Sequence, residues 1–111
     1  MQVFNALAEP KFTPEKANKV NAVRSAELEV DAYFIRAGQA HTWHRHENDH
    51  AVIGIGGTGS LVLDQSGEVK IPLAPGVVAL APKGVWHRIE ATTDLTALTT
   101  STFPVRVQER G

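Results

Sequence analysis

Four of the five histidines in this chain are spaced like the ligands of a metal ion. His44, His46 and His50 form the pattern H-x-H-x3-H, and His87 follows in a separate segment. Neutral imidazole is the commonest protein ligand for divalent transition metals. Isolated histidines are mostly surface or core residues, but three within seven residues of a non-helical segment favour a metal site over those ordinary roles.

Strand geometry places part of this set. On an extended strand, residues two apart point to the same face, so His44 and His46 are expected to project together. The intervening residues 47–49 read as a turn, so alternation does not place His50. His87 lies in a second segment marked by glycine and proline. Two segments meeting over one metal would bring the four histidines together.

The same alternation predicts the orientation of three neighbouring rings. His41 is out of phase with His44, so it is expected to face away, exposed or behind the ligands rather than binding. Trp43 and Trp86 each precede a ligand candidate and should point off the metal face. Packing or a dimer contact is therefore expected of them rather than substrate stacking.

The rest of the chain reads as short strands separated by turn residues. Apolar and β-branched runs recur every eight to twelve residues or so, which is typical of an all-β sandwich or barrel. The expected strands are Glu27–Ile35, Ala51–Ile55, Ser60–Asp64, Glu68–Leu73, Val77–Ala81, Val85–Glu90, Leu95–Phe103 and Val105–Gln108.

The first twenty residues differ from this pattern. Residues 1–20 carry Pro10, Pro14 and several lysines, and they read as an N-terminal arm with at most a turn of helix at Thr13–Ala17. Residues 21–111 are expected to form one domain, because the chain is too short for two cores.

Composition excludes several classes of protein. The net charge is −1 with mixed signs, and no basic stripe suggests a nucleic-acid partner. No apolar run approaches the length of a membrane span, and the N-terminus does not resemble a signal peptide, so a cytoplasmic protein is expected. The absence of cysteine removes disulfides, thiolate ligands and a cysteine nucleophile.

Two motifs resemble those of the cupin superfamily. The first family motif, G-x5-H-x-H-x3,4-E-x6-G, is similar to Gly38-x5-His44-x-His46-x3-His50-x6-Gly57. The second, G-x5-P-x-G-x2-H-x3-N, is similar to Gly76-x5-Pro82-x-Gly84-x2-His87. The chain departs twice: His50 replaces the family's glutamate and Ala91 its final asparagine. The resemblance covers residues 38–91.

This resemblance implies an all-β, double-stranded β-helix (jelly-roll) cupin barrel. It implies one divalent transition metal per chain, held by His44, His46, His50 and His87 with positions left open for catalysis. Manganese or iron is favoured among four-histidine cupins, with zinc, nickel or copper as alternatives. His50 removes a negative charge from the ligand set, or else lies near the metal without binding it.

Other side chains near the motifs are candidates for supporting roles. Phe34 and Arg36 precede Gly38 on a strand expected to line the barrel. Both are possible substrate contacts, and Arg36 can hold a carboxylate or be an ordinary surface residue. The nearby carboxylates, any of which can orient a histidine through its second nitrogen or simply be exposed, are Glu47, Asp49 and Glu90.

Three functions fit these observations. The favoured one is a small-molecule metalloenzyme with dioxygenase-like chemistry. A non-redox lyase, isomerase or cyclase is the second, because a divalent ion with neutral ligands keeps its full charge. The third is a non-catalytic module that binds a metal or small ligand. A homodimer paired through sheet edges is also expected, as in many small cupins.

Overall fold

A computed structural model describes residues 2–102 and 107–110. These residues form ten strands and no helix, so none of their elements is a helix able to cross a membrane. The strands are β1 (Asn18–Arg24), β2 (Leu28–Ile35), β3 (His44–His46), β4 (His50–Gly56), β5 (Gly59–Asp64), β6 (Glu68–Leu73), β7 (Val78–Ala81), β8 (Trp86–Ala91), β9 (Leu95–Thr102) and β10 (Val107–Glu109).

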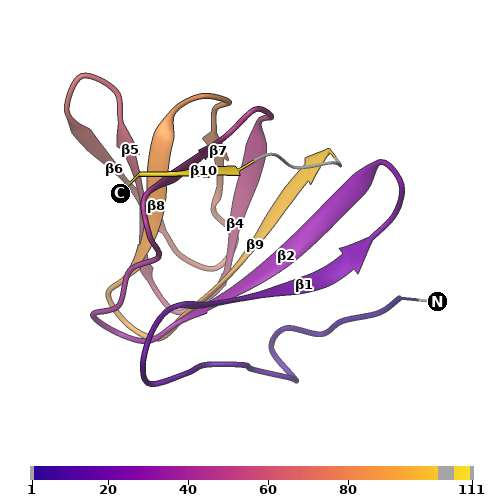
Figure 1. Ribbon diagram of the computed structural model, residues 1–111. Coiled ribbons are helices and arrows are strands. Elements are labelled where there is room, and N and C mark those ends of the chain that lie inside the picture. Colours follow the sequence, from indigo (N-terminus) through magenta and orange to yellow (C-terminus); the bar gives the residue numbers. More distant parts are fainter. Residues whose placement is uncertain (1, 103–106, 111) are drawn as a thin grey trace.

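The strands form two antiparallel sheets that face each other (Figure 1). Sheet A has the order β1-β2-β9-β4-β7, and sheet B has the order β10-β3-β8-β5-β6. Neighbours along the chain therefore often lie in different sheets, which is the arrangement of a jelly roll. The predicted all-β jelly-roll fold is confirmed. Among the described residues, no ladder of hydrogen bonds joins the two sheets into a closed barrel.

The main core lies between the sheets. Its members are the inward-facing apolar residues of alternating strands: Ala17, Tyr33, Ile35, Val52, Leu61, Leu63, Leu73, Ala81, Ile89, Ala91 and Leu95. Burial of a large aliphatic side chain stabilises the fold by about 1.5–3 kcal/mol. This core packs the two sheets against each other.

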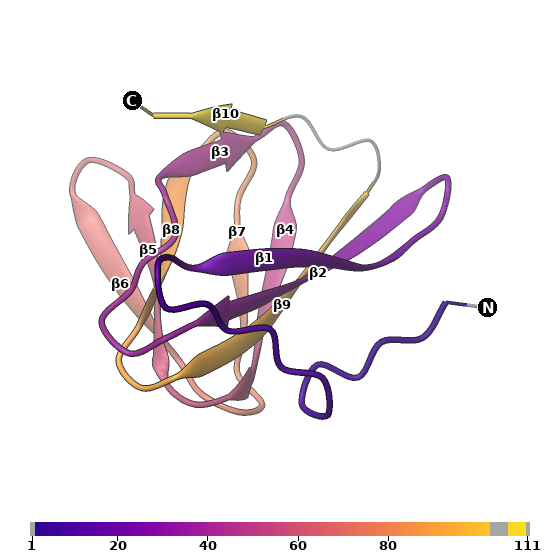
Figure 2. The same cartoon turned by 60° about the horizontal axis from the view of Figure 1, so that its bottom comes forward.

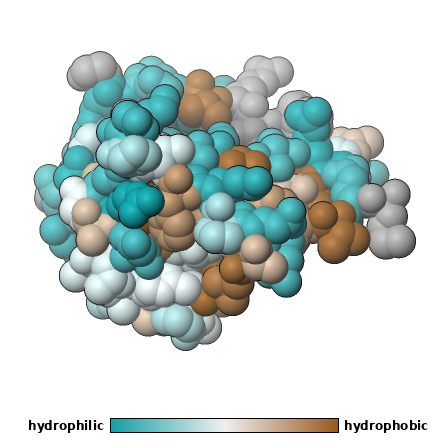
Figure 3. Space-filling view, turned by 90° about the horizontal axis from the view of Figure 1, so that it is seen from below, coloured by the Kyte–Doolittle hydropathy of each residue, from teal (hydrophilic) through white to brown (hydrophobic). Residues whose placement is uncertain are grey.

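A second, smaller core lies on the outside of sheet A, and we call it the arm cluster: Ala6, Ala32 and Phe34 with Phe4, Phe12, Val20, Ile55 and Leu98 packed against them. Phe4 and Phe12 each meet the Phe34 ring edge-on, at centroid separations of 6.4 and 5.5 Å. Figure 2 shows the N-terminal segment running along this side of sheet A. From the same side, Figure 3 shows apolar residues interleaved with hydrophilic ones.

The arm cluster corrects one sequence prediction. Phe34 was expected to line the barrel, but it is fully buried under the arm on the opposite face of sheet A. Its neighbours Tyr33 and Ile35 face the interior instead. The error arises because β2 is buried on both faces, so hydrophobicity alone does not reveal which alternating set points inward.

Strand boundaries agree closely with the sequence patterns, and β1 and β3 are added to the expected strands. β1 starts at Asn18, inside the segment expected to be an arm, and residues 13–17 form no helix. The hydroxyl of Thr13 donates to the carbonyl of Lys16. Phe103 and Val105, which belonged to the two last expected strands, lie outside the described residues. The boundary at residues 20 and 21 stays a prediction.

Two motif glycines hold the turns that position the site. Gly57 has a φ of 72°, and a Cβ there would lie 1.8 Å from the carbonyl oxygen of Asp94. Gly84 has a φ of 76°, and its amide donates to the carbonyl of His46 at 2.8 Å. Glycine takes this left-handed conformation without steric cost. The Gly84 contact ties the loop before β8 to the strand that carries two of the histidines.

Candidate metal centre

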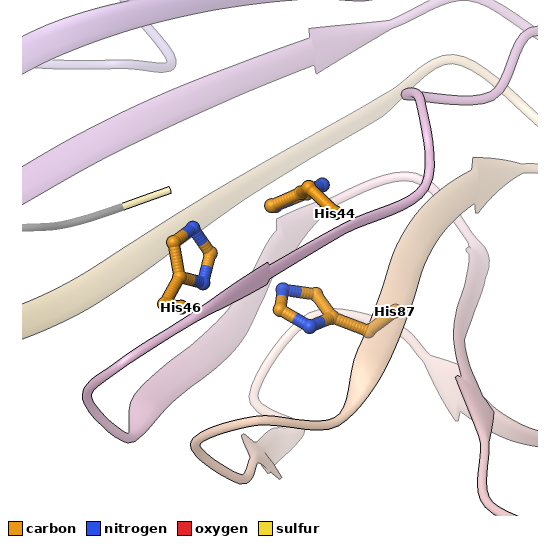
Figure 4. Close-up of side chains that lie close together, drawn as sticks. All are labelled: His44, His46 and His87. Atoms are coloured by element: carbon orange, nitrogen blue, oxygen red, sulfur yellow. The ribbon is translucent and has the colours of Figure 1, made fainter. Parts of the chain in front are cut away.

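Three histidines converge between the sheets. His44 and His46 extend from β3 and His87 from β8, and antiparallel pairing places His44 directly opposite His87. One ring nitrogen from each of the three lies within 4.8 Å of the others. We call these residues the histidine cluster (Figure 4). All three are buried, with exposed fractions of 3–5%.

Backbone carbonyls fix the protonation pattern of two of these rings. The Nδ1–H of His44 donates to the carbonyl of Thr42 at 2.8 Å, and that of His87 donates to the carbonyl of Val85 at 3.0 Å. A carbonyl can only accept, so in the neutral ring the proton is on Nδ1 and the lone pair is on Nε2. This is the tautomer in which a histidine presents Nε2 to a metal.

His46 has no such partner. Its Nδ1 is buried and makes no hydrogen bond, which is unusual for a buried polar atom. An unsatisfied ring nitrogen beside two rings with directed lone pairs fits a cation. Ligands with bonds of about 2.1 Å to one ion lie at most about 4.2 Å apart, so small ring rotations suffice to close the site. The donor set therefore fits a transition metal ion.

His50 lies beside the cluster but is not a member of it. It starts β4 in sheet A, and its ring stacks on that of His46 with centroids 3.8 Å apart and planes 25° apart. Its Nδ1 also points to a backbone carbonyl, that of Asn48, at 3.2 Å. Three of the four predicted ligands are thus brought together as a set, and ligation by His50 stays a prediction.

Burial keeps these histidines neutral. It lowers the pKa of His44 and of His87 to about 4, and it lowers that of His46 to about 2, with neighbouring histidines adding to the effect. The pKa of His50 is also lowered, mainly by burial, and the carbonyl of Asn48 and the charge of Asp31 oppose this. Near neutral pH the rings therefore carry free lone pairs and no charge.

His41 does not face away, contrary to the prediction from alternation. Its ring meets Tyr33 and His44 edge-on, at centroid separations of 5.1 and 4.9 Å. Residues 41–43 are not in a strand, so counting by twos from His44 does not hold there. His41 packs behind His44 and is not a member of the cluster, which agrees with the expectation that it lies behind the ligands rather than binding. Burial lowers its pKa as well.

Trp43, which directly precedes β3, and Trp86, the first residue of β8, lie on the opposite face of sheet B, as predicted. The guanidinium groups of Arg45 and Arg88 stack on Trp86 and Trp43 at 4.6 and 4.9 Å from the ring centroids. Arg110 lies over both rings, at 4.5 and 5.2 Å. The tryptophans thus form an outer layer with arginines and do not reach the histidines.

The remaining candidates have structural contacts of their own. Arg36 is exposed, and its guanidinium lies 5.9 Å from the centroid of the Phe12 ring. Asp49 accepts a hydrogen bond from the amide of Lys83, and Glu90 pairs with Arg88 and Lys70 outside sheet B. Glu47 is exposed. Backbone carbonyls, and not these carboxylates, bind the second ring nitrogen of His44 and His87.

Sequence reasoning missed polar residues on the inner face of sheet A. Asp31 is 8% exposed, and its carboxylate accepts from Asn21 at 3.1 Å and lies 3.8 Å from the ammonium of Lys19. Both Asp31 and Lys19 act electrostatically on His50. The available signal was an acidic residue directly before the apolar run Ala32–Ile35 of β2.

Comparison with known proteins agrees with this geometry. A family model described as "Cupin domain" matches residues 31–103. An RmlC-like cupin protein from Desulfovibrio desulfuricans is 27% identical with a TM-score of 0.83, over 92% of this chain and 96% of that one. The protein TT1209 from Thermus thermophilus is 26% identical with a TM-score of 0.78, over 92% and 97%.

More distant structures share the fold alone. Salicylate 1,2-dioxygenase from Pseudoaminobacter salicylatoxidans, solved as adducts with gentisate, is 16% identical with a TM-score of 0.75. The match covers 95% of this chain but 32% of the dioxygenase. No curated protein sequence matches this chain.

Proposed function

This chain belongs to the cupin family, and we propose that it is a metal-dependent enzyme that carries out dioxygenase-like chemistry on a small molecule. One observation carries the proposal: three buried, neutral histidines from two paired strands direct ring nitrogens toward one point. A pocket lined by His46, Lys83 and Gln108, among others, adjoins the site and leaves room for a ligand. A structural metal site would need no such opening.

We include His50 as the fourth ligand. It occupies the motif position of the family's glutamate, it is buried, and its Nδ1 faces a carbonyl so that Nε2 is the free nitrogen. In the stacked arrangement with His46 the two rings lie nearly parallel. A rotation of the His50 ring would add its Nε2 to the three nitrogens of the histidine cluster.

The ligand set shapes the chemistry. A bound divalent ion would supply Lewis acidity and, if it were manganese or iron, one-electron redox chemistry. The residues of this chain hold it with neutral nitrogen atoms, fix the ring orientation through the Thr42 and Val85 carbonyls, and keep water out. We favour manganese or iron because nitrogen ligands suit both, and zinc, nickel or copper are the alternatives.

The neutral charge of the histidine ligands also favours a second function. A divalent ion that keeps its full charge polarises a carbonyl strongly, which is what a lyase, isomerase or cyclase requires. The two functions predict different metals and different dependence on dioxygen. Binding of a small ligand without turnover is the third candidate.

The first experiment is elemental analysis of purified protein after reconstitution with each metal in turn. We expect about one ion per chain and a loss of most of it in His87→Ala. His41→Ala is the matched control, because His41 touches the cluster without belonging to it. Oxygen uptake with catechols, diketones and flavonols then separates the redox from the non-redox function.

Two outcomes would contradict the proposal. Equal metal content in wild type and His87→Ala would place the metal elsewhere. No metal in either protein after reconstitution would leave a cupin that binds a small ligand without a metal. His50→Glu should keep the metal and change its redox behaviour, and an unchanged spectrum would mean that His50 is not a ligand.

We also propose a homodimer. β7 is an edge strand of sheet A, and it exposes Val78 and Leu80 by 66% and 53%. Exposed apolar side chains on an edge strand are a common site of association. Leu80→Glu is expected to shift the protein toward the monomer in light scattering, while Leu28→Glu, on another exposed apolar residue, should not.

A further inference from the structure

A pocket of about 400 Å³ adjoins the histidine cluster at the end of β3. Three segments line it: the end of β3 with the turn that follows, the loop before β8, and β10. The lining residues are Arg45, His46, Glu47, Lys83, Gly84, Val107 and Gln108. His46 belongs to both the pocket and the cluster, so a molecule in the pocket lies beside the candidate metal centre. Ligand pockets of proteins measure about 300–1,000 Å³, so this one has room for a small molecule.

Strand pairing and hydrogen bonds fix the walls of this pocket. β10 pairs with β3, with Val107 opposite His46 and Gln108 opposite Arg45 (Figure 2). On the other side, the amide of Gly84 donates to the carbonyl of His46 at 2.8 Å. A pocket whose walls are already ordered binds a ligand without the entropic cost of ordering them.

Two cations line the pocket, and they differ in what they already bind. The Nε of Arg45 donates to Oε1 of Gln108 at 2.8 Å, and the guanidinium stacks on Trp86 on the outer face of sheet B. Lys83 is exposed, and among the described residues no carboxylate lies within ion-pair distance of its ammonium. A lysine carries three donors on a flexible four-carbon stem. Lys83 is therefore the cation of this pocket that is available to a ligand.

The backbone of Lys83 is held at the edge of the pocket. Its amide donates to Oδ1 of Asp49 at 2.9 Å, and the amide of Val85 donates to the carbonyl of Pro82 at 3.2 Å. Pro82 and Gly84 are fixed positions of the second sequence motif, whereas the motif leaves position 83 open. The turn thus has a defined shape, and the side chain that it carries at the pocket is not set by the motif.

We propose that Lys83 determines substrate specificity, because its ammonium binds the carboxylate of a small anionic molecule that fills this pocket and reaches the histidine cluster. The second contact of that molecule rests on the proposed metal-dependent function. A charge-assisted hydrogen bond is about twice as strong as a neutral one, so an uncharged analogue would bind more weakly. Glu47 also lines the pocket and repels a carboxylate, which leaves the side of Lys83 for the charged group.

The test titrates two probes of similar shape, the anion benzoate and the neutral benzamide, into the full chain without metal. Amide NMR signals of Gly84 and Gln108 report on the pocket. We expect wild type to bind benzoate about three- to tenfold more tightly than benzamide, and Lys83→Met to bind the two equally. Lys83→Arg keeps the charge and should retain the preference. Lys70→Met is the matched control, because Lys70 pairs with Glu90 outside sheet B.

Two results would overturn the inference. The first is equal affinity of wild type for the two probes, and the second is a preference for benzoate that survives in Lys83→Met. The fold is expected to persist in this variant, because it changes an exposed side chain and keeps the amide that donates to Asp49.

A second measurement separates this inference from the proposed function. In protein reconstituted with manganese, the ring-proton signals of bound benzoate should broaden, because the probe lies beside the paramagnetic ion. His87→Ala, which should lose the metal, is the control for manganese free in solution. Sharp benzoate signals in protein that holds manganese would overturn the inference and leave the metal site. Protein that binds no metal but shows the preference that depends on Lys83 would contradict the proposed function and leave the anion site.

Discussion

The two faces of sheet B carry rings from adjacent positions of the chain, in very different surroundings. On the inner face, His44, His46 and His87 are buried, neutral and directed toward one another. On the outer face, Trp86 and the adjoining Trp43 stack with arginine side chains that reach water. Burial makes the difference, because removing water disfavours the imidazolium ion while an exposed guanidinium keeps its charge.

The largest effect is expected from removing a candidate metal ligand on the inner face of sheet B. His46→Leu should reduce metal affinity by about 100-fold or more, because a ligand to the ion is lost. The apoprotein should remain folded, since leucine removes a buried nitrogen that has no hydrogen bond. Arg45→Leu, one residue away on the outer face, is the matched control. Calorimetric titration with manganese measures the affinity of both variants. An equal loss of affinity in the two would contradict the different roles of the two faces.

The second largest effect is expected from low pH, which should destabilise the apoprotein through the histidines of the inner face. His44 and His87 have a pKa of about 4 in the folded protein, against an ordinary value of 6.5. Between these values the unfolded chain binds more protons, so apoprotein stability is full above about pH 6.5 and falls as the pH drops toward 4. For one histidine the full effect is about 3 kcal/mol. Urea unfolding at several pH values measures the loss.

The control for this pH dependence is His87→Leu. It removes one of the histidines whose pKa burial lowers, so the curve of unfolding free energy against pH should be flatter than in wild type. A variant curve as steep as that of wild type would mean that His87 does not titrate in this range. Trp43→Leu, on the outer face, should leave the slope unchanged.

The smallest expected effect comes from the outer face. Arg110→Ala removes the stacking on both tryptophans, and exposed cation–π contacts contribute about 0.5–1 kcal/mol each. We expect unfolding free energy to fall by about 1 kcal/mol and metal content to stay the same. A marked loss of metal would show that β10, which pairs with β3, supports the inner face as well.

Much of the fold could be predicted from local patterns. Turn residues and apolar alternation marked most strands within one or two residues, because strand ends coincide with glycine, proline and polar turns. β1 was partly missed, since Lys19, Asn21 and Arg24 make it look like exposed chain. Its stability comes from pairing with β2 and from the arm cluster behind it.

The site was only partly predictable for a related reason. His44 and His46 share a face because they lie two apart on one strand, and that relation is local. Asp31 and Lys19 come from another sheet, and only the packing of the sheets brings them toward the histidines. The direction of His41 was wrong because alternation fails outside a strand, although its place behind a ligand was among the expected ones.

The sequence by itself determined the all-β architecture, the turns at the motif glycines and the histidines available for a metal. These follow from backbone preferences and from spacing within single segments. Tertiary structure alone decided that Phe34 faces the arm, that His50 stacks on His46, and that Lys19 shares the inner face of sheet A with Tyr33. Each of these depends on which sheet covers which face, and long-range packing decides that.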